Sequence, residues 1–105
     1  MFKEIKPGEK IISILFSSND NKILYSLPCK NSTPFVKIEE KLYEEFPEYK
    51  ETDNYFLLDG KKVKRFKTVE ENHIKNGKPV ILVTEWFFIF INIQLLYKIF
   101  IEKYN

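Results

Sequence analysis

Apolar and polar residues alternate in two short stretches near the start of the chain, and this alternation predicts a β-hairpin. The first stretch is residues 10–18 and the second is residues 22–27. Every second side chain is apolar and would point to one face: these are Ile12, Ile14 and Phe16, then Ile23, Tyr25 and Leu27. Residues 19–21, Asn-Asp-Asn, tolerate a left-handed turn between the strands. We expect Pro28 to end the second strand.

The spacing of apolar residues then changes to the period of a helix. Offsets of three, four and four place four residues on one stripe: Phe35, Ile38, Leu42 and Phe46. Thr33 is able to cap the start of this helix, and Pro34 suits its first position. Pro47 should end the helix, because the residue before a proline is pushed out of the α region.

The second half of the chain predicts three more strands joined by tight turns. An apolar strand runs into Asp59-Gly60, a pair suited to positive φ, and a short return strand ends at Val63. A polar turn then leads to a last apolar strand at residues 80–83. This order is that of an α+β, β-grasp domain with one helix across a mixed sheet. We expect a core with one residue from each element: Ile14, Ile23, Leu42, Phe56, Ile74 and Leu82.

Turn and strand residues of the second half resemble ubiquitin and its relatives. In that family an apolar strand is followed by Gly-Lys, an apolar residue, Thr-Leu and a late Ile. The matching residues here are Gly60-Lys61, Val63, Thr68-Val69 and Ile74. The similarity covers residues 10–83 and implies a non-catalytic protein-interaction module. The chain continues as Thr84-Glu85-Trp86 instead of ending in Gly-Gly, which argues against a conjugated modifier.

The resemblance also implies a partner-binding surface. The family's usual interaction surface is an apolar patch on the solvent face of the sheet, and Leu57 corresponds to its centre. Ile81 and Val83 would lie beside Leu57 on the outward face of the last strand. The turn at residues 19–21 lacks the leucine that extends this patch in ubiquitin, so we expect that contact to be absent.

A basic run at residues 61–67 is a second candidate surface. Its cations could dock a ubiquitin-binding partner or an acidic protein surface: Lys61, Lys62, Lys64 and Arg65. The alternative is a solvated turn, because exposed charge runs are usually that.

Composition excludes several kinds of chemistry. The chain has 105 residues, which suits one small domain, and its net charge of +2 gives no general attraction to nucleic acid. The single cysteine and single histidine rule out a disulfide framework and a conventional zinc site within one chain. Cys29 is best explained as a buried thiol, and residues 1–8 lack the apolar segment of a secretory signal. We predict a cytoplasmic protein with no enzyme activity, no cofactor and no metal.

The end of the chain does not fit the β-grasp pattern. We divide the chain into a leader at 1–9, a ubiquitin-like domain at 10–85 and an apolar tail at 86–105. As a helix, the sixteen residues 86–101 would span about 24 Å, short of the ~30 Å hydrocarbon layer. Four interpretations stay open: packing back on the sheet, self-association, a membrane anchor that tethers a ubiquitin-like head, or translated non-coding sequence. The whole chain could also be a fragment of a larger protein.

Overall fold

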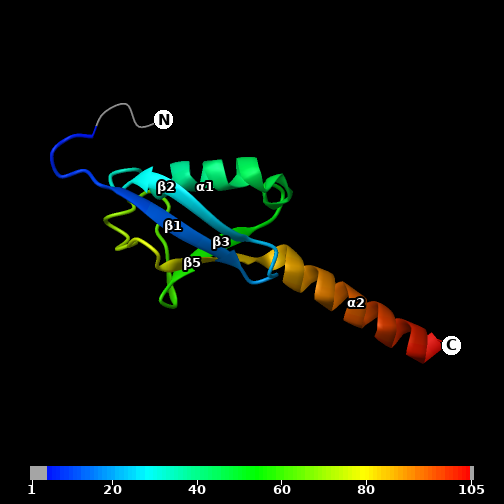
Figure 1. Cartoon of the computed structure of the whole chain (residues 1–105). Helices are drawn as coiled ribbons and strands as arrows, with labels where there is room; N and C mark the ends of the chain where they lie inside the picture. Colours follow the sequence, from blue (N-terminus) through cyan, green and yellow to red (C-terminus); the bar gives the residue numbers. More distant parts are fainter. Residues whose placement is uncertain (1–4, 105) are drawn as a thin grey trace.

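Five strands form one mixed sheet with a helix across one face (Figure 1). The computed structural model describes residues 5–104, apart from the side chains of residues 85–92 and 104. The strands are β1 (Ile11–Ser18), β2 (Leu24–Lys30), β3 (Asn54–Leu58), β4 (Lys61–Lys62) and β5 (Pro79–Thr84). Their order is β2-β1-β5-β3-β4, and only β1 and β5 pair in parallel. With α1 (Phe35–Glu45) packed on this sheet, the α+β, β-grasp prediction is confirmed.

The first hairpin differs from the prediction in one respect. β2 does not end at Pro28 but continues to Lys30, with Pro28 opposite Ser13 of β1. The reason is that β2 is an edge strand. A proline, which has no N–H to donate, is tolerated on an edge strand because half of the backbone groups there have no neighbouring strand to bind. The predicted turn residues do adopt positive φ, at Asn21 (62°) and at Asp59 (51°) and Gly60 (77°).

The core lies between α1 and the inner face of the sheet. All six residues predicted for it are buried: Ile14, Ile23, Leu42, Phe56, Ile74 and Leu82. Three aromatic rings meet at its centre, because Phe35 of α1 contacts Phe16 of β1 and Phe56 of β3 at centroid distances of 6.3 and 5.0 Å. Phe16 and Phe56 also touch each other edge to face, at 5.9 Å. These rings bring strands from both halves of the chain together.

Helix α1 begins without the side-chain cap that Thr33 was expected to supply. Pro34 is the N-cap residue, so the helix begins one position later than predicted, and Pro34 makes no capping hydrogen bond through a side chain. The amides of Phe35 and Val36 instead donate to the carbonyl oxygens of Lys67 and Arg65, both at 2.9 Å. Tertiary contact with the 64–67 loop therefore satisfies amides that a local cap was predicted to satisfy.

The end of α1 follows the prediction. The helix stops at Glu45, and Pro47 begins the short 3₁₀ helix η1 (Pro47–Tyr49).

Leader residues 1–4 and residue 105 lie outside the described part of the chain. The described part of the leader is held to the domain by Glu9, whose carboxylate accepts hydrogen bonds from the Lys6 amide and the Ser32 hydroxyl.

The tail forms helix α2 (Glu85–Tyr104), which continues directly from β5 and projects away from the sheet (Figure 1). Its helical structure was predicted. Several described apolar side chains on it are exposed: Ile93, Leu95, Leu96, Tyr97, Ile99 and Phe100. For residues 93–100, this exposure contradicts the interpretation that the tail packs back on the sheet. In the described residues, no helix has the length and apolar character needed to cross a membrane.

Replacement of Leu42 with alanine should lower the free energy of unfolding by about 2–5 kcal/mol, since it removes a fully buried side chain under the sheet. Leu24→Ala is the matched control. It makes the same chemical change at an exposed position and should alter stability by less than about 0.5 kcal/mol. Urea denaturation of both variants measures the difference, and equal losses would contradict this packing.

Candidate protein-binding surface

The outer face of the sheet, opposite α1, carries a row of side chains that crosses the central strands. The strand register places Leu24 of β2 beside Ser17 of β1, and Ser17 beside Ile81 of β5. Ile81 in turn lies opposite Leu57 of β3, and Leu57 lies opposite Lys62 of β4. Residues paired in this way point to the same face. The row therefore brings together one residue from each of the five strands.

Three apolar members of this row form the outer-face patch: Leu24, Leu57 and Ile81. Leu24 is 79% exposed and Ile81 is 38% exposed, while Leu57 between β4 and β5 is half-buried. Leu24 was missed in the sequence, where no leucine was expected to extend the patch from the first hairpin. The signal was present, because Ile23 and Tyr25 were assigned to the inner face and alternation places Leu24 on the outer one.

Val83 was predicted to be an exposed residue of the patch, but the structure shows that it is buried. It points to the outer face as predicted, but its side chain is only 8% exposed. Its partner across the strands is Tyr55 of β3. Directly opposed side chains of an antiparallel pair lie within contact distance, so a large aromatic residue there limits the access of solvent. Val83 lies outside the main core cluster, so this burial belongs to the outer face.

The predicted basic residues divide into two groups. Lys62 belongs to the outer face, with its ammonium 4.7 Å from the centroid of the Tyr55 ring, a cation–π contact. Lys61 and Lys64 are exposed. Arg65 instead points toward α1 and donates to a Glu39 carboxylate oxygen at 2.8 Å and to the Asn54 carbonyl at 2.9 Å. The run at 61–67 is therefore not one continuous binding surface.

Two solved structures resemble this arrangement of helix and sheet. One is the UBL domain of Dsk2 from Plasmodium falciparum, with a TM-score of 0.62, 15% sequence identity, and coverage of 71% of this chain and 99% of that one. The other is a designed protein based on ubiquitin, with a TM-score of 0.61, 23% identity, and coverage of 75% and 92%. The chain has a ubiquitin-like fold. No family model and no curated protein matches the sequence.

Within this ubiquitin-like fold, Glu39 is the buried end of a polar network. Its side chain is 8% exposed, and one carboxylate oxygen accepts bonds from both Arg65 and the Tyr43 hydroxyl, the latter at 2.7 Å. The side-chain amide of Asn54 donates to the same hydroxyl at 3.1 Å. A buried carboxylate is stable only when it is paired and hydrogen-bonded. Arg65 therefore ties its loop to α1 and β3.

Removal of the Arg65 side chain should lower the free energy of unfolding by about 1–3 kcal/mol, because it leaves the Glu39 carboxylate without its cation. Lys64→Ala, the neighbouring exposed cation, should cost less than about 0.5 kcal/mol. Adding Glu39→Gln to the Arg65→Ala variant should recover part of the loss. Thermal and urea unfolding test this, and equal effects at the two cations would contradict it.

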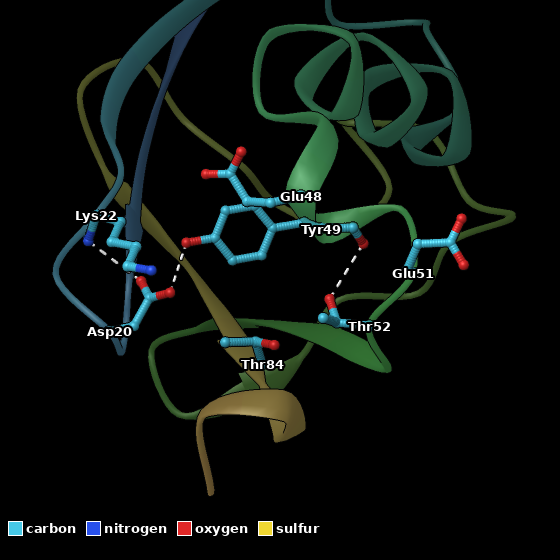
Figure 2. A pocket seen from close by; sticks show the side chains of 7 residues that line it. All are labelled: Asp20, Lys22, Glu48, Tyr49, Glu51, Thr52 and Thr84. Carbon is cyan, nitrogen blue, oxygen red and sulfur yellow. Dashed lines mark hydrogen bonds between the residues drawn. The ribbon is translucent and has the colours of Figure 1, made fainter. Parts of the chain in front are cut away.

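A hollow of about 240 Å³ lies between the first hairpin turn, η1 and the end of β5 (Figure 2). Asp20 of the hairpin turn accepts bonds from the Tyr49 hydroxyl at 2.5 Å and the Ser18 hydroxyl at 2.6 Å. It also accepts a bond from the Lys22 amide at 3.1 Å. Thr84 lines the hollow and is buried. The polar groups here bind one another and so hold the hairpin turn against η1.

The electrostatics of this hollow do not favour proton transfer near neutral pH. Burial by itself would raise the pKa of Asp20, but the bonds from Ser18, Tyr49 and the Lys22 amide hold this pKa below its usual range. Burial and the Asp20 carboxylate raise the pKa of the Tyr49 hydroxyl. Asp20 thus stays ionised and Tyr49 stays protonated, which is a stable donor–acceptor pair.

Acid should destabilise the protein partly through Asp20. A carboxyl group whose pKa is lower in the folded state than in the unfolded state stabilises the fold at pH values above its unfolded-state pKa, about 3.9. This stabilisation is lost as the pH falls through the folded-state pKa. Asp20→Asn should therefore be less stable at pH 7, yet lose less stability than wild type between pH 5 and pH 2. Glu51→Gln, on the rim of the same hollow, is the control. Parallel acid profiles for wild type and Asp20→Asn would contradict this role.

The remaining candidate reactive side chains are those of Cys29 and His73. Burial raises the pKa of the Cys29 thiol to about 11. A thiol with that pKa is a poor nucleophile at neutral pH. His73 is exposed in the turn before β5, with a φ of 59°. Among the side chains that the structure describes, no group of three or more from His, Cys, Asp or Glu is placed to hold a metal ion.

Proposed function

We propose that this chain is a non-catalytic, ubiquitin-like module that binds other proteins through the outer-face patch. The observation that carries this proposal is the gathering of exposed Leu24 and Ile81 and half-buried Leu57 on the sheet face opposite α1. Apolar side chains gathered on one face of a small domain are typical of an interaction site. The likeness to the UBL domain of Dsk2 supports a fold that is suited to this use.

The patch has the composition of a binding-site centre with a polar rim. Leu57 is half-buried and fixed between β5 and β4, so docking would order little that is not already ordered. Ser17 lies within the row, and Lys62 closes it at the edge of the sheet. An apolar centre with polar residues around it is the usual anatomy of a protein interface.

The polar sites favour a module that performs no chemistry. The carboxylate of Asp20 and the hydroxyl of Tyr49 are bound to each other, and the Glu39 carboxylate is bound to Arg65. A general acid or base must be free to reach a substrate, with a pKa near the operating pH. We also propose a reducing, cytoplasmic location, which is consistent with a single buried cysteine.

Leu57→Ala and Ile81→Ala should each weaken binding to a protein partner by about tenfold or more, because each removes an apolar contact at the centre of the patch. The assay is titration of the ¹⁵N-labelled chain with a panel of recombinant ubiquitin-binding domains, followed by NMR chemical shifts. Ile11→Ala is the control, since Ile11 is an exposed apolar residue at the far end of the same face.

Thermal unfolding distinguishes binding from folding for these variants. We expect Leu57→Ala to change the Tm by only a few degrees, because Leu57 lies outside the main core cluster. Partner-induced shifts at residues far from the patch, together with unchanged affinity in both patch variants, would contradict the proposal.

A further inference from the structure

Lysines from two separate segments line a hollow at the β4 edge of the sheet. The hollow has a volume of about 360 Å³ and lies between the β3–β4 turn and the loop that leads into β5. Lys61 and Lys62 contribute from β4, while Lys75 and Lys78 contribute from the loop. All four are exposed. This basic hollow unites half of the predicted basic run with two lysines that lie more than ten positions further along the chain.

Hydrogen bonds hold the two walls of the basic hollow in place. The side chain of Asn72 accepts a bond from the Lys64 amide at 2.8 Å and donates to the Lys64 carbonyl at 2.8 Å. It also donates to the Thr68 carbonyl at 3.0 Å. Across the hollow, the Lys78 ammonium contacts the Asp59 carboxylate at 2.7 Å. The lysines are thus presented by fixed backbone segments and not by a loose tail.

Positive charge is concentrated here out of proportion to the chain as a whole. The net charge of the protein is only +2, yet four lysines and one aspartate line the hollow. Asp59 is bound to Lys78. Among the described side chains, Lys61 and Lys75 have no carboxylate within salt-bridge distance. A concave site whose lining carries a net positive charge attracts a negatively charged ligand.

The basic hollow adjoins the outer-face patch. Lys62 lines the hollow and is also the cross-strand partner of Leu57, the patch residue nearest the β4 edge of the sheet. A polypeptide bound on Leu57 and Ile81 that leaves the sheet at this edge therefore passes the lysines. Resting on the function proposed above, we infer that the basic hollow binds an acidic segment of the same protein partner whose apolar side chain docks on the outer-face patch.

An acidic polypeptide fits better than a nucleic acid or an anionic membrane. Both of these present extended arrays of phosphate, and their binding requires a basic surface of matching extent. The basic hollow is local, and α1 elsewhere on the domain carries the exposed carboxylates of Glu40, Glu44 and Glu45. The adjoining apolar patch also matches a ligand that carries apolar and acidic side chains on one backbone.

A blocked hexaglutamate peptide tests the charge of the basic hollow directly. Titrated into the ¹⁵N-labelled full chain, it should shift the amide signals of residues 59–63 and 73–78, and the shifts should weaken as NaCl is raised. Blocked hexaglutamine should cause no shifts at these residues. Equal shifts with both peptides, or shifts spread evenly over all surface lysines, would overturn the inference.

Two double charge reversals separate the hollow from net charge. Lys61→Glu with Lys75→Glu should weaken hexaglutamate binding by about tenfold or more. Lys64→Glu with Lys67→Glu has the same net charge but changes lysines outside the hollow, and should weaken it by less than about threefold. Similar losses in both variants would mean that only net charge matters. Glutamine replaces glutamate at positions 61 and 75 if the first variant does not fold.

A third titration distinguishes this inference from the proposed function. Leu57→Ala should bind hexaglutamate as wild type does, because the peptide has no apolar side chain. If hexaglutamate does not bind the basic hollow, only the inference of an acidic partner segment is overturned. If the patch variants do not affect partner binding, the proposed function as an interaction module is overturned. Tighter binding of a dodecathymidylate than of hexaglutamate at residues 59–63 would favour a nucleic acid and reject the acidic polypeptide.

Discussion

The contact between the apolar stripe of α1 and the inner face of the sheet is the constraint on which the rest of the structure depends. The Phe35 ring contacts both Phe16 and Phe56, so one helix residue joins the first hairpin to the second half of the chain. Complete burial of each such side chain contributes roughly 1.5–3 kcal/mol. Neither the helix nor the sheet could bury these surfaces alone. With one face committed to the core, the other face is left for recognition.

Loop 64–67 connects the core to the charged surface. Its carbonyl oxygens satisfy the first amides of α1, and its arginine pairs with Glu39 on the same helix. One cation of a uniformly basic run is therefore used to hold the loop, and the lysines at 61 and 62 remain beside the sheet edge. The position of the loop decides which charges can face a partner. Stability and surface chemistry share the same few residues here.

The outer-face patch and the basic hollow describe one continuous recognition surface. Leu57 and Lys62 are neighbours across β3 and β4, and they belong to the patch and the hollow respectively. Apolar contact at the centre supplies affinity, while charge at the edge selects among partners and speeds association. Helix α2 projects from the Thr84 end of β5, and the basic hollow lies near the other end, where Pro79 begins the strand.

The sequence by itself determined the order of elements, the helix stripe, the turn residues and the six core positions. These depend on local periodicity and on backbone preferences that neighbouring residues carry, as Asp59-Gly60 shows with its two positive φ values. It also indicated Leu57 and Ile81 as outward residues. Only the tertiary structure decided four other features. Val83 is buried opposite Tyr55, and Leu24 joins the patch. Arg65 turns to Glu39, and Lys75 and Lys78 line the same hollow as Lys61. Each of these depends on strand register or loop packing between distant segments, and spacing along one segment carries no information about which distant side chain will lie opposite.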